Sequence, residues 1–223
     1  MLAALLAAAC APPLPRPGPA PGPSAPPDFP AAYYMQAIAA GEPVYALDPA
    51  RSLVVVAVRR GGTLARLGHD HVVASHDARG FVAPRAARAD LYVRLAELVV
   101  DEPALRAQAG FDSTPSAADI EGTRGNMLAK VLDAQRHPYA LIHAARAGAD
   151  DRLAVAITLH GVTRDFEVPV RLEEGGDELR VAGTLAFDQS AFGIVPFSIL
   201  GGAIEVRDRV SLRFDIVARR VRR

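Results

Sequence analysis

The sequence has one cysteine, one lysine and no tryptophan, and the shortage of cysteine excludes whole classes of protein. Cys10 is the only cysteine in 223 residues, so the chain can form neither an internal disulfide nor a cysteine-rich metal knuckle. Lys130 is the only lysine, yet arginines raise the basic total to 25, equal to the number of acidic residues. The balanced charge gives no overall field that would attract nucleic acid or an acidic substrate. Phosphate-binding glycine motifs and basic–aromatic surfaces are also missing, so we expect no nucleic-acid partner.

The sequence also lacks a hydrophobic run long enough to cross a membrane as a helix. Met1 to Ala9 is apolar but far shorter than the roughly 20 residues that a span needs. Its small residues lead into Cys10, which resembles the end of a bacterial lipoprotein signal, where the cysteine is lipidated. We therefore expect residues 1–10 to be a signal and Cys10 to tether a periplasmic protein to a membrane. The alternative is a plain signal peptide in which Cys10 has no role.

Proline is concentrated in one segment. Ala11 to Pro30 contains ten of the 18 prolines, mixed with glycine, alanine and serine. Proline fixes φ and removes an amide donor, so this segment is predicted to be an extended, solvated spacer. A short capping helix is expected over Ala31 to Ala40. Residues 11–41 are thus predicted to form a tether and cap, and residues 42–223 the folded domain.

The remaining chain alternates between apolar and polar residues with a period of two. The pattern is clear from Leu153 to Leu159, Val162 to Val170, Leu179 to Phe187 and Ala203 to Val217. One apolar and one solvated face is typical of antiparallel strands. The last strand would extend ~45 Å if unbroken, which favours a tilted, elongated barrel over a small sandwich.

Helix is scarce by comparison. Glu102 to Ala109 and Ser116 to Lys130 are the main candidates, the second with Ser116 or Asp119 as its N-cap. Strands dominate so strongly that the predicted fold class is all-β. We expect one antiparallel barrel of roughly eight strands, with one or two short helices in an insertion.

Four short motifs follow one another at consistent spacing. They are Val44-Tyr45-Ala46-Leu47-Asp48-Pro49, Gly122-Thr123-Arg124-Gly125-Asn126-Met127-Leu128, His137-Pro138-Tyr139-Ala140 and Leu159-His160-Gly161-Val162-Thr163-Arg164. Together they resemble the YceI-like family of periplasmic polyisoprenoid-binding proteins over roughly Val44 to Ala218. The resemblance implies a lipocalin-like barrel with a deep apolar tunnel for an isoprenoid tail. It also implies lipid binding or transport without catalysis and without a required cofactor.

A barrel lined by valine, leucine, isoleucine and phenylalanine must either pack solid or enclose an apolar ligand. Burying a lipid chain in it would contribute roughly 0.8 kcal/mol per CH₂, less the ordering costs. Phe192 and Phe197 are either anchors of a flap over the barrel mouth or ordinary core residues. The predicted lipid-binding residues are the inward ones: Val56, Phe81, Leu91, Val93, Leu141, Val155, Ile157, Phe166, Val168, Leu185, Phe187, Phe192, Phe197 and Phe214.

The segment Gly68-His69-Asp70-His71 supports a rival hypothesis. Positions 69 and 71 share one face of a strand, so both imidazoles could reach a metal or a haem. A third ligand would have to be His76, His137, His143 or His160. The function would then be that of a metal- or haem-associated periplasmic accessory protein. The simpler alternative is that Gly68 makes a turn that the histidines order, and we expect no metal.

Catalytic motifs give no support to an enzyme. Pro196 to Gly202 lacks the Gly-x-Ser-x-Gly spacing of a nucleophile elbow. Asp112, Asp119 and Glu121 are predicted to lie on a solvated face, where nothing would shift a carboxyl pKa. We therefore expect no catalytic residue. A third hypothesis is a solid barrel that binds a protein partner through its rim, and the sequence leaves homodimerisation open.

Overall fold

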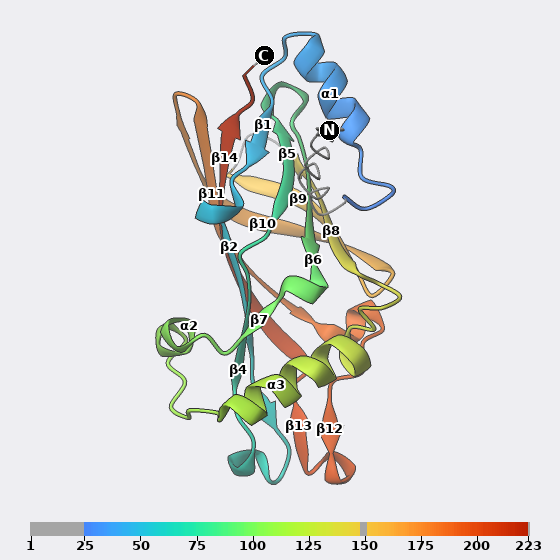
Figure 1. The fold of residues 1–223 in the computed structure, drawn as a ribbon, viewed down its shortest axis with the longest axis vertical. Helices are drawn as coiled ribbons and strands as arrows, with labels where there is room; N and C mark the ends of the chain where they lie inside the picture. The colour runs from blue at the N-terminus through green and yellow to red at the C-terminus, as the bar shows by residue number, and fades with distance from the viewer. Residues whose placement is uncertain (1–24, 148–150, 223) are drawn as a thin grey trace, which may run out of the picture.

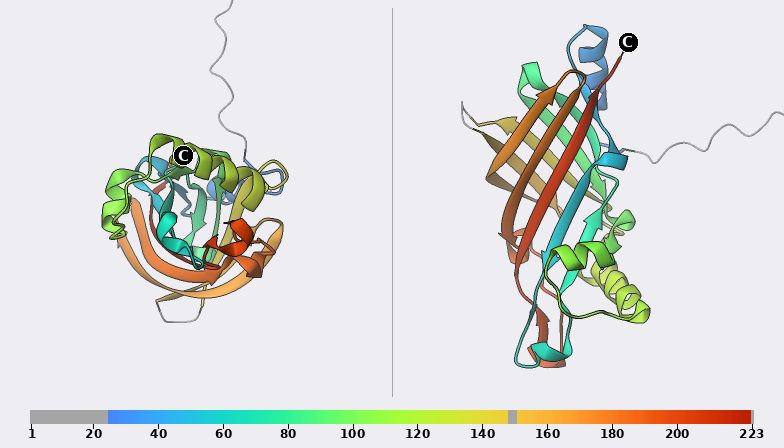
Figure 2. Two further views of the ribbon diagram at one scale, coloured as in Figure 1. Left: turned by 90° about the horizontal axis from the view of Figure 1, so that it is seen from below. Right: turned by 90° about the vertical axis from the view of Figure 1, so that its left-hand side faces the viewer.

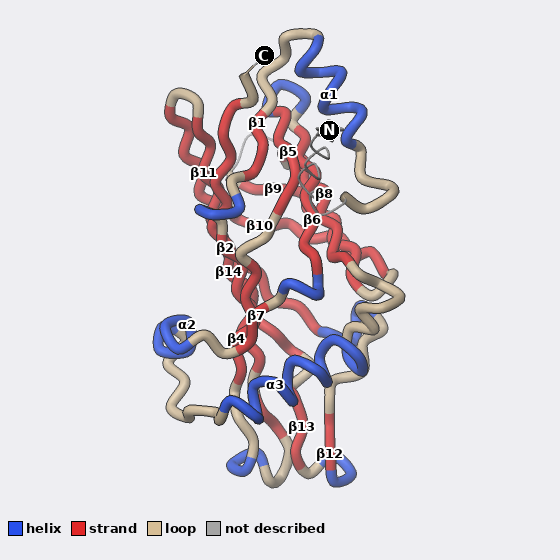
Figure 3. The backbone as a smooth tube through the Cα atoms, in the orientation of Figure 1, coloured by secondary structure: helices blue, strands red, loops and turns tan. Residues whose placement is uncertain are grey.

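Strands dominate the structure, a computed structural model that describes residues 25–147 and 151–222. The strand order β1-β5-β6-β8-β9-β10-β11-β14 closes on itself, because β1 pairs with both β5 and β14. The predicted eight-stranded antiparallel barrel is therefore confirmed (Figures 1 and 3). The strands of this ring are β1 (Tyr45–Leu47), β5 (Arg79–Ala83), β6 (Arg88–Arg94), β8 (Tyr139–Arg146), β9 (Arg152–Leu159), β10 (Val162–Gly175), β11 (Glu178–Asp188) and β14 (Arg209–Arg220).

Three shorter strands prolong the barrel wall toward one end. These are β2 (Leu53–Val58), β4 (His71–Ser75) and β7 (Val99–Val100). Both β1 and β2 pair with β14, and the 3₁₀ turn Pro49–Arg51 lies between them. Likewise β4 pairs with β2 and β7, whereas β5 pairs with β1 and β6. The pairs β1 and β2, β4 and β5, and β6 and β7 are thus long strands that are each interrupted once. Their segments β2, β4 and β7 form the lower part of the barrel in Figure 1.

The insertion between β7 and β8 is helical, as predicted. It contains α2 (Pro103–Gln108) and α3 (Ala117–Asn126), and a π-helical turn over Met127–Val131 continues α3. The Ser116 hydroxyl accepts a hydrogen bond from the Asp119 N–H, and the Asp119 carboxylate accepts one from the Ser116 N–H. This capping box explains why the helix begins at Ala117. Figure 1 shows α3 crossing the lower half of the barrel.

The strand predicted from Ala203 to Val217 is interrupted in the structure. Its first part, β13 (Ile204–Val206), leaves the barrel and pairs with β12 (Ser198–Ile199) and β3 (Arg60–Gly61). The main strand β14 begins only at Arg209. Asp208 fixes the break, because its carboxylate accepts a hydrogen bond from the Ser190 N–H at 2.8 Å. The resulting three-stranded sheet, here called the flap sheet, forms the lower end of the molecule in Figure 1.

The expected short helix precedes the first strand, as α1 (Ala31–Ala39). It lies at the end of the barrel opposite the flap sheet (Figure 2, right). Tyr34 attaches the helix: its side chain is fully buried and its hydroxyl donates a hydrogen bond to Asp90 of β6 at 2.7 Å. Within the described residues, no helix has the length and apolar character needed to cross a membrane.

Candidate functional site

The barrel encloses a continuous cavity of about 920 Å³. Its wall is mostly aliphatic and comes from every barrel strand except β1, from β2 and β4, from α3 and from the flap sheet. The barrel is therefore hollow, and the sequence-based alternative of a solid core does not describe it.

Most of the residues predicted to contact a lipid lie on the cavity wall. They come from six different strands and from the segment before β12, so only the closure of the barrel brings them together. Phe197 is among them, and its carbonyl accepts a hydrogen bond from Val206 of the flap sheet at 2.9 Å. The residues on the wall are Val56, Leu91, Val93, Val155, Ile157, Val168, Leu185, Phe187, Phe197 and Phe214.

Two predicted residues face the other side of the sheet. On β5, Val82 lines the cavity and Phe81 points outward, where its ring stacks on Tyr34 of α1 with centroids 5.1 Å apart. On β8, Ala140 and Ile142 line the cavity, so Leu141 between them faces outward, opposite Tyr92 in the strand register. Both strands carry apolar residues on both faces, so the alternation could not decide which face is buried inside.

Phe166 and Phe192 belong to the core beside the cavity. With Phe187 they form a cluster whose ring centroids lie 5.3 to 6.2 Å apart. Phe192 is fully buried in the turn that leads from β11 toward the flap sheet. Phe187 reaches the cavity wall and the other two rings do not. Phe192 is therefore a core residue, whereas Phe197 is part of the wall.

Sequence reasoning missed a group of small residues on one wall. Ala140, Ala144 and Ala145 of β8 and Ala89 of β6 all line the cavity. Their short side chains leave space in the cavity that larger aliphatic side chains would fill. Ala140 and Ala144 share the inward face of β8 with Ile142, as the alternation of the strand predicts. A search for large inward residues passes over them because alanine is small.

His69 and His71 both line the cavity, and their ring centroids lie 6.2 Å apart. The four histidines considered as a third ligand lie elsewhere: His76 bonds Glu102, His143 bonds Asp90 on the outer face, and the rings of His137 and His160 pair with each other. The described residues contain no group of three or more side chains suited to hold a metal ion. A metal at His69 and His71 stays a hypothesis.

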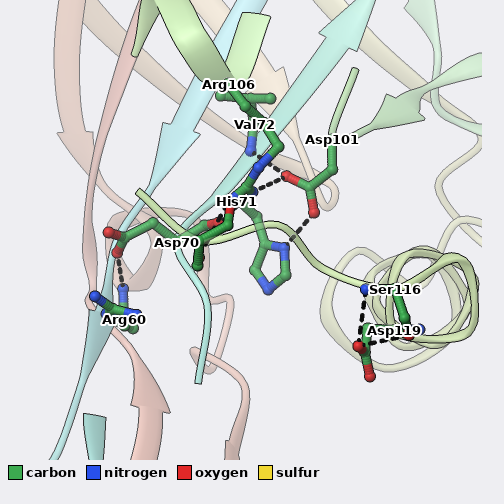
Figure 4. Close-up of polar contacts among 9 residues, drawn as sticks. Arg60, Asp70, His71, Val72, Asp101, Arg106, Ser116 and Asp119 are labelled. Carbon is green, nitrogen blue, oxygen red and sulfur yellow. Dashed lines mark hydrogen bonds and ion pairs between the residues drawn. The ribbon is translucent and has the colours of Figure 1, made fainter. Parts of the chain in front are cut away.

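A buried ion pair beside the cavity holds His71 in place (Figure 4). The carboxylate of Asp101 lies 2.6 Å from His71 Nδ1 and accepts hydrogen bonds from the Val72 N–H and from Arg106. Asp101 is 3% exposed and Arg106 is 5% exposed. Burial raises the pKa of the Asp101 carboxyl, but the bonds from His71, Val72 and Arg106 overcome this and hold the pKa below its ordinary value. Arg106 also donates to the Asp70 carbonyl, so it joins α2 to the start of β4.

The N-terminal lipidation predicted at Cys10 lies outside the described residues, so the structure does not bear on it.

Comparisons with known proteins agree with this fold. A family model described as YceI-like domain matches residues 45–218, most of the chain. One similar solved structure is a polyisoprenoid binding domain from Saccharophagus degradans, implicated in plant cell wall breakdown, with 12% identity and a TM-score of 0.58. The match covers 79% of this chain and 98% of that domain. Another is BcnA from Burkholderia cenocepacia, with 18% identity and a TM-score of 0.54, covering 77% of this chain and 98% of that one. The curated proteins contain no match. The match over residues 45–218 shows that this chain belongs to the YceI-like domain family.

Proposed function

We propose that this protein binds a long apolar lipid of the isoprenoid type inside its barrel and carries it without chemical change. The observation that supports this most directly is the 920 Å³ cavity with its aliphatic wall. A cavity lined in this way favours a ligand that buries methyl and methylene groups, each contributing roughly 0.8 kcal/mol less the ordering costs. Family membership and the polyisoprenoid-binding neighbour from Saccharophagus degradans favour an isoprenoid tail.

The shape of the cavity supports a chain-like ligand over a compact one. Leu179 and Glu174 line it near the β10–β11 hairpin, and Ile199 and Ile204 line it in the flap sheet. These segments lie at opposite ends of the molecule (Figure 1). A flexible hydrocarbon tail can follow such a path along the barrel axis, with its polar end at one mouth.

We further propose that the protein works in the periplasm, tethered to a membrane through lipid on Cys10. The small residues before Cys10 and the proline-rich segment after it support this. Expression of the full chain with labelled palmitate in a bacterium tests it. Wild type is expected to incorporate label and partition with membranes, and Cys10→Ser to lose both. Label-free wild type would refute the tether without affecting the lipid-binding proposal.

Native mass spectrometry of the purified protein, with solvent extraction of its ligand, tests the lipid-binding proposal. Wild type is expected to carry a discrete adduct that extracts as an isoprenoid. Ala144→Phe places a ring inside the cavity, because Ala144 lines it and is 8% exposed, and should strongly reduce the adduct. Ala154→Phe makes the same change on an exposed position of the neighbouring strand and serves as the matched control.

Other outcomes would contradict the proposal. A lipid-free mass for the wild type, unchanged after incubation with isoprenoids, would favour a partner that binds the rim. An adduct with the mass of a metal ion would favour the hypothesis based on His69 and His71. Equal adducts in Ala144→Phe and Ala154→Phe would show that the lipid sits outside the barrel.

A further inference from the structure

One polar atom on the cavity wall is buried without a hydrogen-bond partner in the described part of the chain. It is Nδ1 of His69, just before β4. Buried polar side-chain atoms in folded proteins nearly always have a partner, and an exception requires an explanation. His69 stands on the wall of a cavity large enough for a ligand, so the ligand itself can supply the missing partner.

The surroundings of His69 form a polar region at one end of the mostly aliphatic cavity, and Arg88, Arg146 and Glu174 line its opposite end. His71 stands beside it, with its own Nδ1 occupied by Asp101. Asp119, in the first turn of α3, lines the same cavity and interacts electrostatically with both imidazoles. Figure 4 shows Ser116 holding Asp119 at the start of α3. A lipid head between β4 and α3 would meet these groups while its tail ran into the aliphatic part of the barrel.

The charges at this end argue against an anionic head. Arg60 is the guanidinium on the wall here, and it is engaged with the Gly68 carbonyl and with Asp112. Two carboxylates, Asp119 and Glu205, line the same region. A phosphate or diphosphate binds where free cations outnumber carboxylates, whereas here the guanidinium is engaged and two carboxylates stand beside it. An uncharged oxygen can pair with an imidazole nitrogen without meeting that repulsion.

We propose that His69 is the head-group contact of the bound lipid, and that this end of the cavity selects an uncharged oxygen head over a phosphate. The chemistry shared by the expected ligands is a hydroxyl, ether or carbonyl oxygen on a long apolar tail. This inference rests on the proposed lipid-binding function. It adds the position of the head, between β4 and α3, and the class of head that fits there.

Competition against tritiated geranylgeraniol on the full-length protein tests the inference with ligands that share one tail length. The competitors are geranylgeraniol, its methyl ether, geranylgeranyl diphosphate and the headless hydrocarbon phytane. The alcohol is expected to bind about tenfold more tightly than phytane, as one desolvated hydrogen bond allows. The diphosphate is expected to bind more weakly than the alcohol. An ether as strong as the alcohol would indicate that His69 donates, and a weaker ether that it accepts.

His69→Phe keeps the ring and removes both nitrogens, so it separates head recognition from tail burial. We expect it to weaken geranylgeraniol about tenfold, to the level of phytane, and to leave phytane unchanged. The melting temperature of the lipid-free variant should be unchanged or higher, because an unpartnered buried nitrogen is lost. His76→Phe is the matched control, since His76 is exposed and lies off the cavity wall.

Three outcomes would overturn the inference, and they differ in what they leave standing. Equal affinities for the alcohol and phytane in wild type and His69→Phe would remove the head contact but keep the lipid-binding function. Tightest binding of the diphosphate would show that the site selects an anion. If no competitor binds and the tritiated alcohol is not retained, the proposed function itself fails.

Discussion

Replacing Arg106 with methionine should destabilise the protein severely, because it leaves the buried carboxylate of Asp101 without its cation. Arg106 Nη1 lies 2.6 Å from Asp101 Oδ1 and 2.6 Å from the Asp70 carbonyl. Methionine fills much of the same volume without a charge, so packing is largely kept. The expected effect is thus electrostatic and local to the junction of α2 with β4.

The size of the effect follows from burial. Both partners are at most 5% exposed, so solvent cannot replace the lost bond. Breaking a buried pair by removing one partner typically costs about 3–5 kcal/mol. For a domain of this size, each kcal/mol lowers the melting temperature by about 2–4 °C, so we expect a fall of about 10 °C.

Urea unfolding followed by far-ultraviolet circular dichroism measures this, because the chain has no tryptophan to report by fluorescence. Arg180→Met is the control: Arg180 pairs with Asp215 in a similar geometry, but on the surface. Exposed pairs contribute little, so this variant should lose far less stability than Arg106→Met. The double variant Arg106→Met with Asp101→Asn should recover part of the loss, since it removes the isolated charge. Asparagine also tolerates the left-handed backbone at position 101, where φ is 59°.

The reasoning would be refuted if Arg106→Met cost less than about 1 kcal/mol in the free energy of unfolding. It would also fail if the double variant were no more stable than Arg106→Met alone. Either result would mean that water reaches Asp101.

Two further predictions concern acid stability and the phenylalanine cluster. Hydrogen bonds outweigh burial and hold the pKa values of Asp101 and Asp90 below their ordinary range. Such carboxyls stabilise the fold above their unfolded-state pKa of about 3.9, and this stability is lost as the pH falls through that value toward the folded-state pKa. The melting temperature should thus drop steeply below about pH 5, and less steeply in Asp101→Asn; equal slopes would exclude Asp101 as a source. Phe192→Ala should cost about 3–5 kcal/mol in urea unfolding, because Phe192 is fully buried. Val195→Ala, at an 80% exposed position nearby, should change stability by less than about 0.5 kcal/mol, and similar losses in the two variants would contradict the assignment of Phe192 to the core.

The local pattern predicted the barrel well because the alternation of apolar and polar residues along each strand is visible in the sequence itself. Leu153 to Leu159 forms β9, and its inward residues Val155 and Ile157 lie on the cavity wall. Ser116 was named as a candidate cap, and it does cap α3. Such features depend on neighbours within a few residues, so they survive in any fold that contains the segment.

Predictions that depended on distant partners were less secure. Phe81 faces outward because α1 covers that side of β5 with Tyr34, and β5 by itself gives no sign of this cover. The break at Asp208 depends on Ser190, which lies on the preceding turn. The buried pair of Asp101 and Arg106 was not anticipated, since neither residue is distinctive until the fold removes both from water.

The sequence by itself determined the fold class, the capped helix and most of the inward-facing residues, because these follow from periodicity and capping chemistry along the chain. Tertiary structure alone decided that the inward face encloses a cavity. The space inside the barrel depends on how its eight strands close into a ring and on where alanines leave room. It also decided that His69 has a buried nitrogen with no hydrogen-bond partner among the described residues. Whether a polar atom has a partner depends on every segment packed around it, and no local pattern encodes that.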